Sequence, residues 1–217
     1  MPLPYRYWEK LEKNAVLLAV LIAIAVSFGG LAEIIPLFND AQTVKPAPGI
    51  TPYEPLRLAG RDVYVREGCY LCHSQMIRTL SFETQRYGRF SQAGEFVYDR
   101  PFQWGSKRTG PDLHRVGGRY SDDWHRLHLM NPRDLVPESN MPAYPWLART
   151  AANAEDIEAK LKALRRLGVP YATEEISKSR DDLKGKSEMD ALIAYLQMTG
   201  TLVDFRTYKA EAPENRR

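Results

Sequence analysis

Two cysteines and a histidine stand close together in this sequence and could do chemistry as a group. Cys69 and Cys72 are the two cysteines of the chain, three residues apart, and His73 follows directly. Two thiols at this spacing can each add to one vinyl group of a haem, which leaves the adjacent histidine beneath the iron as an axial ligand. The C-x-x-C-H pattern is typical of c-type attachment and predicts one covalently attached haem c.

A C-x-x-C pair also occurs in redox disulfides and in zinc sites. Zinc would need a second pair of ligands at comparable spacing, and the remaining histidines, at positions 114, 125 and 128, do not resemble such a pair. A thioredoxin-like redox site would need a βαβ context, which the sequence does not predict. The haem interpretation is therefore favoured.

A second axial ligand is needed as well, because a six-coordinate iron reorganises little during electron transfer and admits no oxygen. Met141 is the favoured candidate. It lies in the irregular segment 136–146, where three prolines stiffen the chain, so that its side chain can be presented with little entropy left to lose. The other methionines considered lie too close to His73 or within expected helices (Met76, Met130, Met189 and Met198).

Three expected helices surround these residues. A short helix should lead into the cysteine motif, because apolar positions recur there at helical spacing. A second should run from Ser121 to Asn131, and a third should begin with a capping box at Ser187 and stop at Gly200. The periodic positions of the first and third helices are Leu56, Gly60, Val63, Tyr64 and Glu67, and Leu192, Ile193, Tyr195 and Leu196.

Two helices that bracket a C-x-x-C-H motif resemble the class I cytochrome c fold, in which they cross at a small residue and an aromatic one. Gly60 and Tyr195 are placed for that contact. Segment 109–113 (TGPDL) is similar to the loop that follows the axial histidine in this fold. The resemblance implies that the Pro111 carbonyl accepts a hydrogen bond from His73 Nδ1, which fixes the tautomer and orientation of the ring.

An uncharged run of eighteen residues, Ala15 to Ala32, predicts a membrane anchor. About twenty apolar residues in a helix cross a hydrocarbon core of roughly 30 Å. A cleaved signal peptide is the alternative, but its apolar core would be shorter and small residues would mark the cleavage site. Basic residues before the run slightly favour a cytoplasmic N-terminus, and Glu33 is expected at the outer interface.

The expected fold class is mainly α, with one N-terminal transmembrane helix and a class I cytochrome c domain that carries loop and helical insertions. Residues 1–38 are expected to form the anchor, and residues 39–55, rich in proline and without apolar periodicity, an extended linker. Residues 56–203 are expected to form the haem domain, with an insert at about 151–186, and residues 204–217 a C-terminal tail.

Composition agrees with a folded head on a single anchor. The chain has 217 residues, of which 44% are hydrophobic and 26% charged, with a formal net charge of +3. These values exclude a disordered chain and a multi-span membrane protein, and the slight charge, without a nucleic-acid motif, argues against a nucleic-acid partner. His114, His125 and His128, the pair Lys107-Arg108 and the run 160–166 are expected on partly exposed or solvated faces.

Longer strings give a more specific resemblance. The chain resembles the mono-haem subunit of cbb3-type cytochrome c oxidases (the CcoO/FixO type), and the single anchor, the order of motifs and the length also match. The strings that carry the resemblance are EGCYLCHSQMIR (67–78), AGEFVYD (93–99), WGSKRTGPDL (104–113) and NMPAYPW (140–146).

This resemblance implies an electron relay with no substrate chemistry of its own. Such a subunit holds one haem c, with His73 and Met141 as axial ligands, on the periplasmic face of a bacterial inner membrane. It takes electrons from a di-haem cytochrome c subunit or from a soluble cytochrome c. It passes them to the catalytic haem–copper oxidase subunit, which reduces oxygen and pumps protons. A methionine ligand raises the redox potential, which keeps the transfer downhill.

Two other functions are compatible with an anchor and a haem domain. The mono-haem cytochrome c subunit of a bacterial nitric oxide reductase has the same plan, although the strings above argue against it. A membrane-anchored haem sensor would keep its sixth coordination position labile, so that carbon monoxide would bind there.

Overall fold

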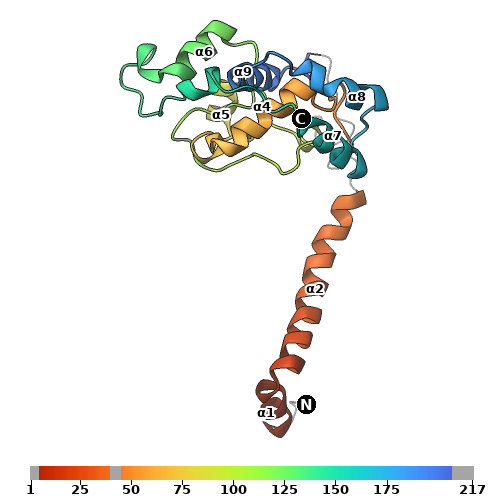
Figure 1. The fold of residues 1–217 in the computed structure, drawn as a ribbon. Helices are drawn as coiled ribbons and strands as arrows, with labels where there is room; N and C mark the ends of the chain where they lie inside the picture. Colours follow the sequence, from red (N-terminus) through yellow and green to blue (C-terminus); the bar gives the residue numbers. More distant parts are fainter. Residues whose placement is uncertain (1–4, 40–44, 207–217) are drawn as a thin grey trace. The chain divides into compact units, whose positions relative to one another are not determined.

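The chain divides into two compact units, Met1–Lys45 and Pro46–Arg217, drawn in Figure 1. The computed structural model describes residues 5–39 and 45–206, so that most of the expected C-terminal tail (204–217) lies outside the described residues. Within the described part the structure is built of helices and turns, with one isolated antiparallel bridge and no strand. The mainly α fold class is confirmed.

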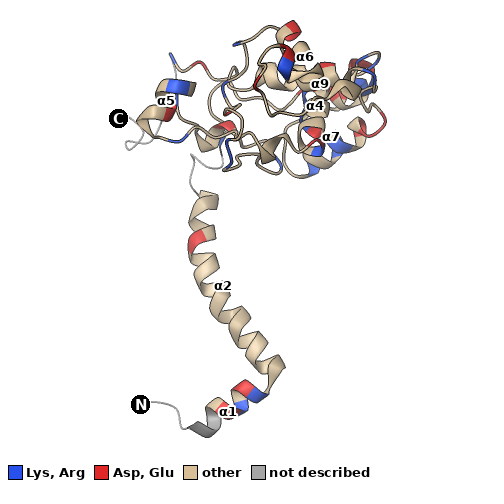
Figure 2. Ribbon diagram, turned by 90° about the vertical axis from the view of Figure 1, so that its left-hand side faces the viewer, with Lys and Arg blue, Asp and Glu red and all other residues tan. Residues whose placement is uncertain are grey.

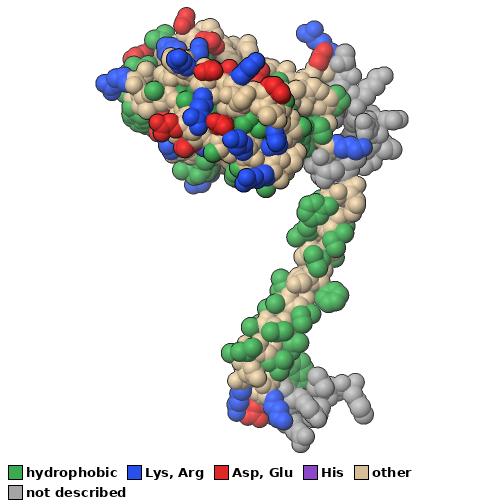
Figure 3. All heavy atoms as spheres, turned by 45° about the vertical axis from the view of Figure 1, so that its right-hand side comes forward, with side chains coloured by type: hydrophobic (Ala, Val, Ile, Leu, Met, Phe, Trp, Pro, Cys, Tyr) green, Lys and Arg blue, Asp and Glu red, His purple; other side chains and the backbone are tan. Residues whose placement is uncertain are grey.

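The first unit consists of helices α1 (Tyr5–Lys13) and α2 (Ala15–Asn39). Asn14 separates them, and its Oδ1 accepts a hydrogen bond from the third residue of α2 at 3.0 Å. α2 has 25 residues, about 37 Å at 1.5 Å per residue, a hydropathy of 2.6 and no buried residue. Apolar side chains cover it in Figure 3.

Helix α2 is therefore long and apolar enough to cross a membrane, as the sequence predicts. Glu33 is its one charged residue, and it is the acidic position that Figure 2 marks along this helix. The last turn of α1 carries Lys10 and Lys13, so that basic residues lie directly before the apolar helix.

The second unit forms the head, and two of its helices, α6 and α9, begin where the sequence indicates. Ser121 caps α6 by accepting a hydrogen bond from Trp124 N at 3.2 Å. Ser187 caps α9 in a capping box with Asp190, so both predicted helix starts are confirmed. The elements are α4 (Pro55–Arg66), η1 (Cys69–Leu71), α5 (Ser81–Tyr87), η2 (Ala93–Glu95), α6 (Asp122–Met130), η3 (Pro132–Asp134), η4 (Pro145–Ala148), α7 (Ile157–Arg166), α8 (Thr173–Asp182) and α9 (Glu188–Met198).

Helices α4 and α9 cross in direct contact at Gly60. A Cβ atom at this position would lie 1.9 Å from the Ala191 carbonyl oxygen and 2.9 Å from Tyr195 Cβ. Because backbone fills this space, only glycine fits, and the predicted contact of Gly60 with Tyr195 is confirmed. The crossing holds the middle of α4, which ends just before the cysteine motif.

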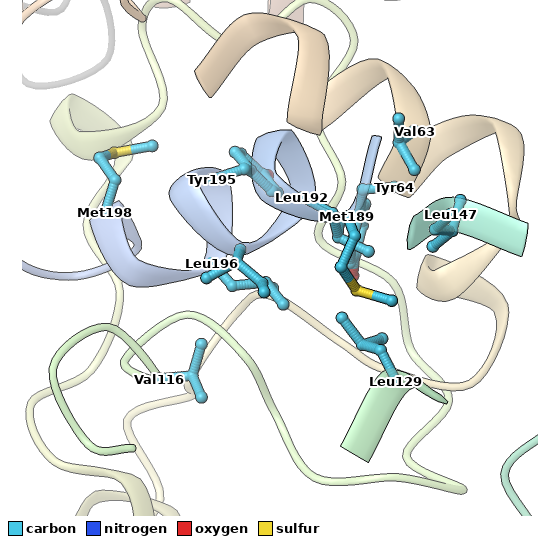
Figure 4. Close-up of a cluster of buried hydrophobic side chains, with 11 residues drawn as sticks. Val63, Tyr64, Val116, Leu129, Leu147, Met189, Leu192, Tyr195, Leu196 and Met198 are labelled. Atoms are coloured by element: carbon cyan, nitrogen blue, oxygen red, sulfur yellow. The ribbon is translucent and has the colours of Figure 1, made fainter. Parts of the chain in front are cut away.

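The main core lies between α4, α6 and α9. Tyr64, Leu129 and Met189 meet there, one from each helix, and Figure 4 shows them around a common centre. Met189 and Met198 are both buried, so the prediction that they belong to the core is confirmed. The other buried members are Val63, Val116, Leu147, Leu192, Ile193, Tyr195 and Leu196.

The insert at 151–186 is an ordered helical pair, α7 and α8, with an apolar cluster of its own. Its two ends lie together, because Ala152 N donates to Lys186 O at 2.9 Å beside the antiparallel bridge. This cluster packs on the side of α4 that the main core leaves uncovered. Its buried members are Ala152, Ile157, Leu161, Val169, Tyr171, Ile176 and Leu183 from the insert, Leu58 and Ala59 from α4, and Ala191 from α9.

The stretch 39–55 differs from the extended linker that the sequence predicts. α2 continues to Asn39, and residues 40–44 lie outside the described part of the chain. Ala47 is buried and its N–H donates to a backbone carbonyl of the head at 2.9 Å. Tyr53 donates through its hydroxyl to a buried carboxylate of the head at 2.5 Å. The prolines of this region therefore stiffen a segment that is packed on the head.

Candidate functional site

Gly68 joins helix α4 to the cysteine motif. Its backbone is left-handed, with φ at 71°, a conformation that glycine adopts without strain. The 3₁₀ turn η1 follows, and His73 N donates to Cys69 O at 2.9 Å. This tight turn places both thiols and the imidazole in one short loop, as their action on a single ligand requires.

The imidazole of His73 is held from behind by Pro111. The Pro111 carbonyl oxygen lies 2.7 Å from Nδ1, and because a carbonyl can only accept, Nδ1 carries the proton and Nε2 is the nitrogen that can bind a metal. Gly110 permits this approach, since a Cβ there would lie 2.2 Å from His73 Cε1. Burial lowers the pKa of His73, against the opposing effect of the Pro111 hydrogen bond, so the ring is neutral at pH 7.

The two thiols are separate from each other. Cys69 is half-buried, Cys72 is exposed, and they form no disulfide. Burial raises the pKa of the Cys69 thiol to about 12, whereas a redox-active cysteine acts as the thiolate. In the described ranges, no group of three or more His, Cys, Asp or Glu side chains is arranged to hold a metal ion. The raised pKa of the Cys69 thiol argues against a redox-active dithiol.

Met141 lies in an irregular loop that is tied to α6. Met141 N donates to Ser139 Oγ at 3.2 Å, and Tyr144 N donates to Leu129 O, in α6, at 2.8 Å. The loop ends in η4 at Pro145. These bonds and the prolines fix a side chain that is partly buried against the main core.

This donor set fits a haem bound through its two vinyl groups. Two unbridged thiols, one imidazole nitrogen and one thioether are the groups that such an attachment and a six-coordinate iron require. Cys69, Leu113 and Met141 pack on the same apolar cluster, which offers the dry surroundings that a haem ring favours. The assignment of these residues to haem stays a prediction.

A polar network behind His73 is the part of the site that sequence reasoning missed. The sequence places Arg108 on a solvated face, and the structure corrects this. The Arg108 side chain is 18% exposed and donates to Ser74 Oγ, Met76 O and the Glu83 carboxylate at 2.7, 2.8 and 2.7 Å. The acceptors of these hydrogen bonds lie 25 to 34 positions away, so no local pattern marks Arg108 as buried.

Glu83 is the buried end of this network. Its side chain has no exposed surface, and it also accepts hydrogen bonds from the backbone N–H of Arg78 at 2.8 Å and from the Arg78 side chain at 2.5 Å. The hydrogen bond from Arg108 lowers the pKa of Glu83 to about 2. The carboxylate is therefore ionised at pH 7 and docks the short helix α5 on the residues that follow the cysteine motif.

Two of the three further histidines are more buried than the sequence indicates. His114 and His125 are only 6% and 4% exposed, and His114 stacks on the ring of Phe96 with centroids 4.5 Å apart. His125 and His128 both pack on Trp124, in α6. Burial lowers the pKa of all three imidazoles. The expectation of partly exposed polar side chains therefore holds for His128 and is wrong for the other two.

One comparison with known proteins identifies a relationship. The family model described as cytochrome c oxidase, mono-haem subunit/FixO, matches residues 8–187, well over half of the chain. No curated protein matches the chain.

Proposed function

Because the chain belongs to the family of mono-haem subunits of cytochrome c oxidase, we propose that it relays electrons within such an oxidase by means of one covalently attached haem c. Bound haem would supply an iron centre that gains and loses one electron. The chain itself performs no substrate chemistry. Oxygen reduction and proton pumping belong to the catalytic haem–copper subunit that it serves.

Four side chains would hold the haem. Cys69 and Cys72 would form thioethers with its vinyl groups, and His73 Nε2 and the Met141 sulfur would be the axial ligands. The Pro111 carbonyl, 2.7 Å from His73 Nδ1, would orient the imidazole and raise its basicity. Covalent links would keep the haem from dissociating, and two protein ligands would leave no coordination position for oxygen.

The observation that carries this proposal is the immobilised imidazole beside two unbridged thiols. A disulfide oxidoreductase would not need a histidine whose Nδ1 is fixed by Pro111 and whose ring is packed on Gly110. The membership in a mono-haem family supports the same conclusion. The tied loop around Met141 favours a relay over a haem sensor, because a sensor needs a ligand that leaves easily.

The membrane arrangement follows from the anchor. Helix α2 would cross a bacterial inner membrane with the N-terminus in the cytoplasm, since Lys10 and Lys13 lie directly before it. The head would then lie in the periplasm. There it would take electrons from a di-haem cytochrome c subunit or a soluble cytochrome c and pass them to the catalytic subunit.

Gentle detergent extraction of the tagged full-length chain from its native membranes tests the proposal. We expect b-type haems and oxygen uptake with an artificial donor to co-purify with the haem c absorbance. Haem c alone, or nitric oxide reduction in place of oxygen uptake, would show that the complex is a different one. The reduced c-type haem should also leave carbon monoxide unbound, and a carbon monoxide complex at this haem would favour the sensor.

A further inference from the structure

We propose that Ser74, Arg108 and Asp112 are positioning residues for His73: they clamp the two chain segments whose hydrogen bond fixes the axial imidazole, and they thereby set the redox potential of the site. The inference rests on the proposed function, because it takes His73 as an iron ligand. It assigns a role to the polar network that neither the cysteine motif nor the methionine loop explains.

The clamped hydrogen bond joins segments that are far apart in the sequence. His73 and Pro111 are 38 positions apart, and two backbone bonds flank their contact. Gly110 N donates to Cys72 O at 2.9 Å, and Leu113 N donates to Ser74 O at 2.9 Å. A shift of one segment against the other would therefore change the distance between the imidazole and the Pro111 carbonyl.

Asp112 ties together the immediate neighbours of the two ends of this bond. It follows Pro111, and its carboxylate accepts from the hydroxyl of Ser74, which follows His73, at 2.6 Å. The same carboxylate accepts two backbone N–H groups, at 2.9 and 2.8 Å. Its side chain has no exposed surface, so these three donors replace water, and any displacement would leave buried groups without partners.

The Ser74 hydroxyl links two charges. It is buried, at 1% exposure, and has a single proton. That proton goes to Asp112, and the oxygen accepts from Arg108 Nε at 2.7 Å. One hydroxyl thus couples a cation on one side to an anion on the other, and its orientation is fixed by both.

Glu83 holds the guanidinium in place. Arg108 Nη2 donates to Glu83 at 2.7 Å and to Met76 O at 2.8 Å, so the arginine also grips the segment that carries His73. Glu83 is fully buried, so removal of Arg108 would leave its charge to the half-exposed Arg78. The guanidinium cannot move without loss of several bonds at once, which makes the clamp rigid.

The redox consequence follows from the imidazole. A hydrogen bond from Nδ1–H to a carbonyl raises the basicity of Nε2, which favours the oxidised iron. Without the Ser74 hydroxyl, Arg108 and Asp112 face each other with Nη2 and Oδ2 3.5 Å apart. We expect the two side chains to approach each other. This movement would displace the segment that contains Pro111 and lengthen the hydrogen bond from His73 Nδ1 to the Pro111 carbonyl. The redox potential of the haem should then rise.

The test compares three serine variants of the full-length chain in the detergent-extracted complex. Ser74→Ala removes the bridging hydroxyl and keeps both charges, and Ser74→Thr restores a hydroxyl. Ser179→Ala is the matched control, because Ser179 is also fully buried but donates only to Ile176 O, in α8 of the insert, at 2.7 Å. Each variant is analysed by redox titration of the haem c band and by the low-spin EPR spectrum, which reports the orientation of axial ligands.

We expect Ser74→Ala to raise the reduced-to-oxidised ratio at a fixed applied potential by about tenfold, which is about 59 mV for one electron, and to alter the EPR spectrum. Ser74→Thr and Ser179→Ala should match the wild type in potential and in EPR spectrum. If Ser74→Ala lowers stability but leaves potential and EPR spectrum unchanged, the clamp is purely structural and the inference is wrong.

Two further results separate the possible failures. If Ser74→Ala does not load haem, Arg108→Lys provides the same test. A lysine keeps a positive charge beside Glu83, but its single ammonium group cannot reach Ser74 Oγ, Met76 O and Glu83 at once. A wild-type chain without low-spin haem c would overturn the proposed function, whereas a normal wild type with an unchanged variant would overturn only the clamp.

Discussion

Replacement of Gly60 by alanine should separate the two helices on which the head is built. The new Cβ would lie 1.9 Å from the Ala191 carbonyl oxygen, and ordinary contact begins at about 3.4 Å, so α4 and α9 must move apart by about 1.5 Å. A gap of 0.5–1 Å already forfeits a quarter to a half of the dispersion energy of a contact. The obstacle is backbone, which cannot rotate away as a flexible side chain could.

The expected magnitude follows from two opposing effects. Overpacking costs about 1–3 kcal/mol and occasionally more, while alanine gains about 1 kcal/mol over glycine in a helix. Because the clash is deep and involves the carbonyl of Ala191, we expect the overpacking cost to exceed this range, at about 4 kcal/mol. Gly60→Ala should then lower the free energy of unfolding by about 3 kcal/mol net.

Urea unfolding of the full chain in detergent, followed by near-UV circular dichroism, measures this loss. With a slope of roughly 1–3 kcal/mol per molar urea, the midpoint should fall by about 1–3 M. Gly30→Ala is the control, because Gly30 belongs to the anchor helix α2 and not to the head, and a Cβ there meets nothing within 4 Å. The unfolding midpoint of the head should therefore equal that of the wild type. A Gly60→Ala chain that also unfolds at the wild-type midpoint would refute the close crossing.

Three further outcomes are expected. Met141→Ala should abolish the sulfur-to-iron charge-transfer band of the oxidised protein while the haem stays covalently attached, and an unchanged band would exclude Met141 as the ligand. The hydrogen bond from Arg108 lowers the pKa of Glu83 from 4.5 to about 2, so its contribution to stability is complete above pH 4.5 and is lost as the pH falls toward 2. Urea midpoints should fall over that range and fall less steeply in Glu83→Gln; equal slopes would contradict this linkage. Ser187→Ala removes the hydroxyl that accepts from Asp190 N and should cost about 1 kcal/mol in the same assay, whereas an unaltered midpoint would mean that the cap contributes nothing.

Local patterns predicted the apolar anchor helix, three of the head helices (α4, α6 and α9) and the position of the cysteine motif. Ser121 and Ser187 act on residues three positions away in the sequence, so their neighbours alone reveal the caps. The contact at Gly60 was also predictable, but only from the resemblance to a known fold, because its partners lie on a distant helix. The apolar run before Glu33 needed no tertiary information.

Features that depend on distant partners could not be predicted in the same way. Arginine is usually a surface residue, and its neighbours in the sequence give no sign that Arg108 is buried. Only the folded chain shows that Ser74 and Glu83 bond to it. Tyr53 lies in a proline-rich stretch typical of a linker, but its hydroxyl reaches a carboxylate 46 positions away. Such pairings arise when the chain is folded back on itself, which no local spacing records.

The helical insert has a consequence for attempts to shorten this protein. Its ends are hydrogen-bonded to each other, so a short turn could join them without disturbing the path of the chain. Excision would nevertheless strip the outer side of α4 and leave Leu58, Ala59 and Ala191 open to water. A trimmed head would therefore expose an apolar surface that favours aggregation, and it would hold less firmly the helix that leads to its cysteine motif. The chain path allows the insert to be removed, but its packing helps to stabilise the domain.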